Sequence, residues 1–260
     1  MLTKLIKHEF KATSRILLPL YLVLAVFTII NRLNFNFDQL QESFPLLHGL
    51  ILSGYVLSLI AMFVVTFVIL IIRFYKNLTS EEGYLMFTLP VTPRQLINSK
   101  LLVASVWTVL SFIAVIVSLF FLVIFPGEMH EFLRVIKDVR ENLTESFGSY
   151  GILFIIEIII VVILSILNDL LKIYLSIAIG QLINGHKLIG SIGAYIGINI
   201  VIQIITTILL TIAGFAYQTY ANPMDIPRSF FPIMILLLLL LNIVYYEVTN
   251  YLFKNKLNLE

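Results

Sequence analysis

The sequence predicts an all-α integral membrane protein with six transmembrane helices and both termini in the cytoplasm. Of the 260 residues, 60% are hydrophobic and only 12% are charged, whereas a soluble domain of this size carries about twice that share of charge. Several apolar runs exceed the roughly 18 residues that a helix needs to cross the hydrocarbon core. The chain has no cysteine, which excludes disulfides and cysteine-based catalysis or metal binding. We expect a single transmembrane domain covering residues 1–260.

Residues 1–14 are expected to form an amphipathic interfacial helix. Apolar residues recur at helical spacing on one side, and lysines occupy the other side. The apolar residues are Leu2, Leu5, Ile6 and Phe10, and the lysines are Lys4, Lys7 and Lys11. The alternative is that these lysines are the ordinary positive flank of the first span. No small-residue cleavage site follows, so a cleaved signal peptide is not expected.

The six apolar runs predict the spans, and polar segments separate them. The spans are expected at about 16–30, 50–72, 101–125, 151–182, 188–213 and 231–251. Residues 128–149 show helical spacing of apolar and basic side chains, which predicts an extracellular helix. Residues 217–228 contain Asn222-Pro223 and Ile226-Pro227 and are expected to be kinked and non-helical.

The distribution of basic residues predicts the orientation. With the N-terminus inside, only five of the 17 Lys and Arg residues face outward. These five are Arg32, Arg134, Lys137, Arg140 and Arg228. Cytoplasmic loops carry the excess of Lys and Arg, so both termini and the loop at residues 80–100 are expected in the cytoplasm.

The loop at residues 80–100 combines charge, two prolines and large apolar residues. Ser80 with Glu81 and Glu82 is a helix-start signal, because acids favour the positive end of the helix dipole. Leu85, Met86 and Leu89 then share one face. Pro90 ends this short helix. Thr92-Pro93 begins the next one, with proline at the first helical position and Thr92 as the cap.

This loop resembles the signature loop of type-2 ATP-binding-cassette (ABC) permeases, the membrane subunits of exporters. The resemblance covers about 20 residues and rests on Glu82-Gly83, Leu89-Pro90, Pro93-Arg94, Ile97 and Lys100. It implies a coupling helix that sits in a groove of a separate ATPase subunit. The residues expected to couple are Glu81, Glu82, Gly83, Leu85, Leu89, Pro90, Pro93, Arg94 and Lys100.

The resemblance also implies the partners. Two ATPase subunits would bind ATP and Mg, and a second permease copy or a related permease would complete the pathway. This chain itself has no GxxxxGK[ST] loop, so no cofactor is expected in it. It has no HExxH motif and its four histidines are scattered, so no metal site and no catalytic residues are expected.

Ionisable residues inside the expected spans need a partner or a purpose. Glu157 lies six residues into the fourth span, and three explanations stay open for it: a bond to a neighbouring helix, protonation, or a position near the outer interface. Asp169 and Lys172 are three apart on one helix and can form a structural ion pair. Glu247 and Lys254 near the end of the last span suggest a similar local pair.

The fifth span carries a polar stripe and a pair of small residues. Asn199, Gln203 and Thr206 follow one another at i, i+4 and i+7, and Gly193 and Gly197 form a GxxxG pair. Either these residues are ordinary helix–helix contacts, or they face a transport pathway or a dimer interface. The resemblance to exporters adds weight to the second interpretation, and both interpretations stay open at this point.

The function that the sequence favours is export of a hydrophobic or amphipathic substrate, and a peptide is the first candidate. The chain would be the permease and is not expected to be an enzyme. Two other classes stay open. One is an intramembrane enzyme that uses Glu157 or Asp169, and the other is a non-transporting immunity or sensor protein.

Overall fold

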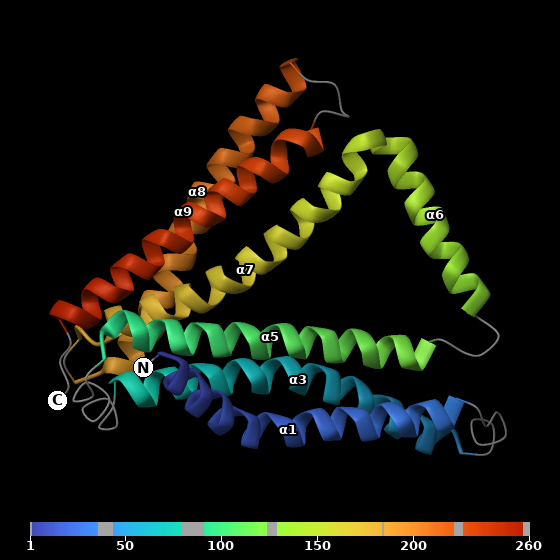
Figure 1. The fold of residues 1–260 in the computed structure, drawn as a ribbon, viewed down its shortest axis with the longest axis horizontal. Helices are drawn as coiled ribbons and strands as arrows, with labels where there is room; N and C mark the ends of the chain where they lie inside the picture. Colours follow the sequence, from blue (N-terminus) through green and yellow to red (C-terminus); the bar gives the residue numbers. More distant parts are fainter. Residues whose placement is uncertain are drawn as a thin grey trace. The chain divides into compact units, whose positions relative to one another are not determined.

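The structure is a computed structural model that describes residues 2–35, 44–79, 91–123, 129–183, 185–220 and 226–256. These residues form seven α-helices and one 3-10 turn, and none of them forms a strand. The helices are α1 (Leu2–Phe35), α3 (Pro45–Thr79), α5 (Pro93–Val123), α6 (Met129–Phe147), α7 (Gly151–Gly180), α8 (Lys187–Tyr220) and α9 (Ile226–Asn255), with η1 (Gly148–Tyr150) before α7 (Figure 1). The predicted all-helical fold is confirmed.

Six of these helices are long and apolar enough to cross a membrane. They contain the stretches Leu2–Asn34, Pro45–Leu78, Pro93–Leu122, Gly151–Gly180, Lys187–Ile212 and Phe230–Asn255. Each expected span coincides with one of them, so the predicted number of spans is confirmed at the level of length and composition. The remaining helix, α6, was expected to lie outside the hydrocarbon, and its sidedness stays a prediction.

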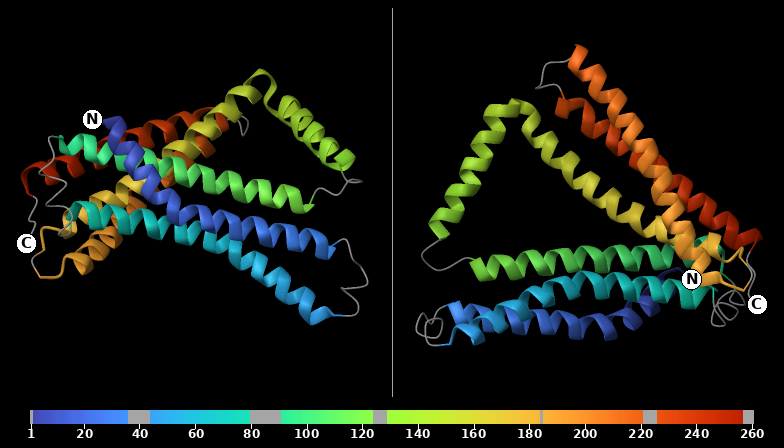
Figure 2. Two further views of the ribbon diagram at one scale, coloured as in Figure 1. Left: turned by 60° about the horizontal axis from the view of Figure 1, so that its bottom comes forward. Right: turned by 180° about the vertical axis from the view of Figure 1, so that it is seen from behind.

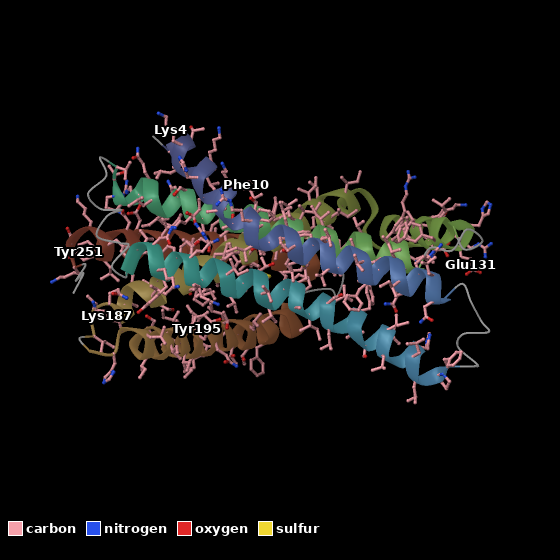
Figure 3. All side chains as sticks on the ribbon, turned by 90° about the horizontal axis from the view of Figure 1, so that it is seen from below. Lys4, Phe10, Glu131, Lys187, Tyr195 and Tyr251 are labelled. Atoms are coloured by element: carbon pink, nitrogen blue, oxygen red, sulfur yellow. The ribbon has the colours of Figure 1, made fainter. Side chains whose placement is uncertain are left out.

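Three predicted boundaries differ from the structure. The expected interfacial helix at 1–14 and the first span belong to one continuous helix, α1, and the hydroxyls of Thr13 and Ser14 bond to carbonyls of the preceding turn within it. The N-terminal turns, where Lys4 and Phe10 are labelled, still lie at an angle to the rest of α1 (Figure 3), and Pro19 lies within the helix where it removes one backbone bond.

The second difference concerns the segment expected to be non-helical. Helix α8 continues to Tyr220 and α9 already begins at Ile226. Pro227 lies in the first turn of α9, where the missing N–H has no intrahelical partner to lose.

The third difference is the end of α7, which lies at Gly180. The amide N–H groups of Gln181 and Leu182 close this end by donating to the carbonyls of Ile177 and Ile179.

The chain divides into two compact units. The first comprises Met1–Arg73 and Asn98–Lys137, and the second comprises Phe74–Ile97 and Asp138–Glu260. Helices α3, α5 and α6 therefore contribute to both units, and each unit is described by itself.

In the first unit, hydroxyl groups join α1, α3 and α5, which run side by side (Figure 1). Ser111 and Ser118 are seven residues apart on one face of α5, and both are buried. Their partners are Tyr21 and Thr28 of α1, at 3.0 and 2.7 Å, and Thr66 and Tyr55 of α3, at 3.2 and 2.8 Å. Small hydroxyl residues let helices approach closely and bond to each other, as is typical of membrane helix packing.

In the second unit, α7 contacts both α8 and α9, and the three helices converge toward the C-terminal end of α7 (Figure 2). A buried amide pair joins α7 to α9, with Asn168 Nδ2 donating to Asn242 Oδ1 at 3.1 Å, while Asn242 Nδ2 donates to the Leu164 carbonyl. Phe74 stacks on Tyr174 with ring centroids 3.5 Å apart. Polar bonds and aromatic stacking together fix this end of the unit.

The hairpin between α7 and α8 depends on close backbone approach. A Cβ atom at Gly180 would lie 2.5 Å from the Ser191 amide nitrogen and 2.7 Å from the Lys187 carbonyl oxygen. Gly185, in the turn between the helices, has a φ of +83°, a left-handed conformation that favours glycine. Alanine at Gly180 would force the two helices apart.

We predict that Gly180→Ala lowers the stability of the detergent-solubilised protein by about 1–3 kcal/mol, the usual range for overpacking. The measurement is the midpoint of thermal unfolding. Gly49→Ala is the matched control, because Gly49 lies inside α3 with nothing within 4 Å of its Cβ position, and alanine there should be neutral or stabilising by up to about 1 kcal/mol. Equal midpoints for the two variants would contradict the close approach.

Candidate functional site

The described part of the expected coupling loop is its second half, which begins α5. The Thr92 hydroxyl accepts from the Gln95 amide at 3.4 Å, and the Gln95 side-chain oxygen accepts from the Thr92 amide at 3.3 Å. This reciprocal pair is a capping box, and Pro93 takes the first helical position. The predicted helix start at Thr92-Pro93 is confirmed. The other expected coupling residues, Glu81, Glu82, Gly83, Leu85, Leu89 and Pro90, lie outside the described residues.

Arg94 lies on the surface of the second unit and pairs with α9. Its Nη2 atom lies 2.9 and 3.2 Å from the two carboxylate oxygens of Glu247. The expected pairing of Glu247 with Lys254 is therefore replaced by a pairing with a residue 153 positions away. The two side chains are 58% and 50% exposed, and ion pairs exposed to this extent contribute little to stability.

The first unit contains a set of charges that is much more buried. Glu9 Oε1 lies 3.0 Å from Arg73 Nε and 3.2 Å from Lys100 Nζ. The side chains of Glu9, Arg73 and Lys100, here called the Glu9 cluster, are 11%, 21% and 4% exposed. One carboxylate of α1 thus binds a cation from α3 and a cation from α5.

An aromatic and hydroxyl layer lies one turn further along α1. Trp107 of α5 donates its indole N–H to Thr13 Oγ1 at 2.7 Å. The Phe10 ring stacks on Trp107 with centroids 4.9 Å apart and an angle of 17° between the planes. Directional contacts between α1 and α5 therefore extend beyond the Glu9 cluster.

The Glu9 cluster carries one negative and two positive charges. A buried charge without a partner is costly, and removal of one member of a buried pair is strongly destabilising. Both cations bind the same oxygen, so Glu9 links Arg73 of α3 to Lys100 of α5. The cluster fixes the approach of three helices.

Lys100 thereby has a position that the loop resemblance did not predict. It was expected among the residues that contact a partner, and it is instead buried against Glu9. Glu9 itself had no expected role. The available signal was that Glu9 is the one acid among the first 37 residues and lies on the apolar side of the amphipathic helix, opposite Lys4, Lys7 and Lys11. All three lysines are exposed.

The ionisable residues expected inside the fourth span have local partners. Lys172 Nζ lies 3.2 Å from Asp169 Oδ1, so the predicted pair forms. The Tyr150 hydroxyl donates to Glu157 Oε2, and this bond comes from the turn that precedes the same helix. Among the described residues, no three His, Cys, Asp or Glu side chains gather as they would around a metal ion.

The polar stripe of α8 bonds within its own helix. Asn199 donates to the Tyr195 carbonyl at 2.8 Å, and Thr206 donates to the Ile202 carbonyl at 2.8 Å. Gln203 is exposed. Apart from adjacent residues and the backbone of α8 itself, no described atom lies within 4 Å of the Cβ positions of Gly193 and Gly197. The stripe and the glycine pair therefore lie on helix surface that the described residues leave open.

Comparison with protein-family models, with curated proteins and with solved structures gives no match for this chain. The class that the fold itself defines is an all-helical protein with six helices able to cross a membrane. Its buried ionic centre, as far as the described residues show, is the Glu9 cluster.

We predict that Glu9→Gln destabilises the protein by about 3–5 kcal/mol, because two buried cations lose their shared anion. The thermal unfolding midpoint measures the loss, and the emission of Trp107, the single tryptophan of the chain, reports changes beside the cluster. Adding Lys100→Met to Glu9→Gln should recover part of the stability, since it removes one of the two cations.

Glu247→Gln is the matched control for this substitution. It makes the same chemical change in an exposed pair, and we expect a loss within about 1 kcal/mol. If Glu9→Gln and Glu247→Gln unfold at the same temperature, the Glu9 cluster does not stabilise the unit.

Proposed function

We propose that this chain is the membrane-spanning permease subunit of an ATP-driven ABC exporter in a bacterial plasma membrane. The observation that carries the proposal is the segment at residues 80–100, which joins the second and third candidate spans and resembles the coupling loop of type-2 ABC permeases. In this proposal a separate ATPase binds ATP and Mg, and two permease copies, or this chain and a related one, form the pathway.

The packing beside the loop supports a mechanical role. Helix α5 starts with a capping box, and Leu96 and Ile97 in its first two turns are buried. This start is therefore a fixed element rather than a loosely held one. A force applied to Pro93 and Arg94 would be transmitted along α5.

The Glu9 cluster supports the same proposal from the first unit. The loop lies between α3 and α5 in the sequence, and each of these helices contributes one cation to Glu9 of α1. A movement of either helix relative to α1 would have to stretch a buried ion pair. Movements of the loop would thus reach three helices together.

The substrate class follows from the residues that the spans offer. The candidate spans are rich in Leu, Ile, Val and Phe and carry few charges, so a hydrophobic or amphipathic substrate is favoured over a small ion or a sugar. A peptide, such as an antimicrobial or toxin peptide, combines apolar and polar groups in this way.

The first test concerns the ATPase. We predict that Leu85→Asp and Leu89→Asp each abolish co-purification of this chain with a Walker-motif ATPase encoded by a neighbouring gene, because a carboxylate would be placed in an apolar contact. The measurement is pull-down of the co-expressed pair, together with substrate-stimulated ATP hydrolysis.

Leu40→Asp is the matched control, since it makes the same change in the 36–43 segment, which the proposed topology puts on the opposite face of the membrane. It should leave association intact. Full association of both loop variants would refute the proposed coupling.

The second test concerns the side of the membrane. Because the chain has no cysteine, Glu82→Cys and Asp38→Cys each introduce a single thiol. We predict that a membrane-impermeant maleimide labels Asp38→Cys in intact cells and labels Glu82→Cys only after the membrane is opened. Labelling of Glu82→Cys in intact cells would put the loop outside, away from ATP, and the proposal would fail.

A further inference from the structure

Helix α6 has an apolar face that the described residues leave largely uncovered. Its residues Leu133, Val135, Ile136 and Val139 are 55%, 57%, 48% and 52% exposed. Phe132 contacts the Phe120 ring at a centroid distance of 5.0 Å. Most of this face therefore lacks a covering element in the part of the chain that the structure describes.

The same helix is amphipathic around its circumference. At about 100° per residue, Phe132, Val135, Ile136 and Val139 fall within one side of the helix. The opposite side carries Glu131, Arg134, Asp138 and Glu141. Side chains stand out on all sides of α6, with Glu131 labelled near its N-terminal end (Figure 3).

The neighbours of α6 in the sequence hold it close to a membrane surface. Helices α5 and α7 are both candidate spans, and no span lies between them, so the adjoining ends of α5 and α7 are on the same face of the membrane. Five residues separate Val123 from Met129, and η1 joins Phe147 directly to Gly151. At about 3.6 Å per residue of extended chain, both ends of α6 stay within about 20 Å of a span end.

A helix of 19 residues is roughly 28 Å long. With both ends tethered near one surface, its long axis can lie along that surface and its apolar side can enter the boundary between headgroups and acyl chains. Interfacial helices bind in this way when they combine an apolar face, a charged face and low net hydrophobicity.

We infer that α6 is an interfacial helix that binds the lipid surface through the apolar face formed by Phe132, Val135, Ile136 and Val139. The charges of the helix indicate which lipids it selects. It carries three basic residues and four acidic ones, so attraction to anionic lipids adds little. Burial of apolar area carries the binding, which is then insensitive to headgroup charge.

The test uses the full chain, which has no cysteine of its own. Single thiols are introduced as Ile136→Cys and Val139→Cys on the apolar face, with Asp138→Cys and Glu141→Cys as controls on the opposite face. Each variant is labelled with a small environment-sensitive fluorophore and placed in nanodiscs of phosphatidylcholine, with or without phosphatidylglycerol. Two quenchers are compared, acrylamide in the water and a nitroxide attached near the top of the lipid acyl chain.

The expected result is severalfold stronger nitroxide quenching and weaker acrylamide quenching at positions 136 and 139 than at 138 and 141, in both lipid mixtures. Equal acrylamide quenching on the two faces would show that the apolar face is in water. Protection of positions 136 and 139 from both quenchers would show that protein covers the face. Strong nitroxide quenching only with phosphatidylglycerol would show charge-driven binding, and each of these three outcomes overturns the inference.

Discussion

The arrangement of the first unit depends on the carboxylate of Glu9, which binds Arg73 of α3 and Lys100 of α5 within 3.2 Å. Helices in a membrane gain little from apolar contact with one another, because lipid is as apolar as leucine. Directional polar contacts then decide which helix faces are apposed. The buried face of α1 carries such contacts along its whole length, from Glu9 and Thr13 to Thr28 and Asn31.

The hydroxyl contacts and the Glu9 cluster contribute differently to this packing. A hydroxyl that loses its interhelical partner can bond to its own helix, as Thr28 already does with the Leu24 carbonyl. Movement of α1 away from α3 or α5 instead separates the Glu9 carboxylate from Arg73 or Lys100, which are the other charges of the cluster. The hydroxyls can therefore adjust as helices shift, whereas the Glu9 cluster constrains the shift itself. In the proposed exporter, this constraint is what makes α1, α3 and α5 respond together to the loop.

The sequence was sufficient for the features that depend on local chemistry. Hydropathy gave the six candidate spans, and the residue types at Thr92-Pro93 gave the start of α5. The pairing of Asp169 with Lys172 also followed from spacing on one helix. The contacts of the candidate site were out of reach because they join residues far apart in the chain, such as Glu9 with Arg73 and Arg94 with Glu247. Hydropathy does not specify which face of one span meets which face of another.

Helix ends were the features that the sequence predicted least well. Breaker residues do not exclude helix in this segment, since Pro227 is tolerated in the first turn of α9.

The polar stripe and the glycine pair of α8 were compatible either with helix–helix contact or with a pathway or dimer face. In the structure, Asn199 and Thr206 donate hydrogen bonds to carbonyls of their own helix. An exposed amide such as Gln203 is unfavourable in hydrocarbon, so it requires either water or a polar partner. In the proposed assembly, a second permease copy or a water-filled pathway meets that requirement, and the glycine pair leaves room for a close approach. The polar groups in these apolar helices are thus satisfied in two ways. The charges of the Glu9 cluster bind one another within the chain, whereas the exposed amide of α8 requires water or a polar partner.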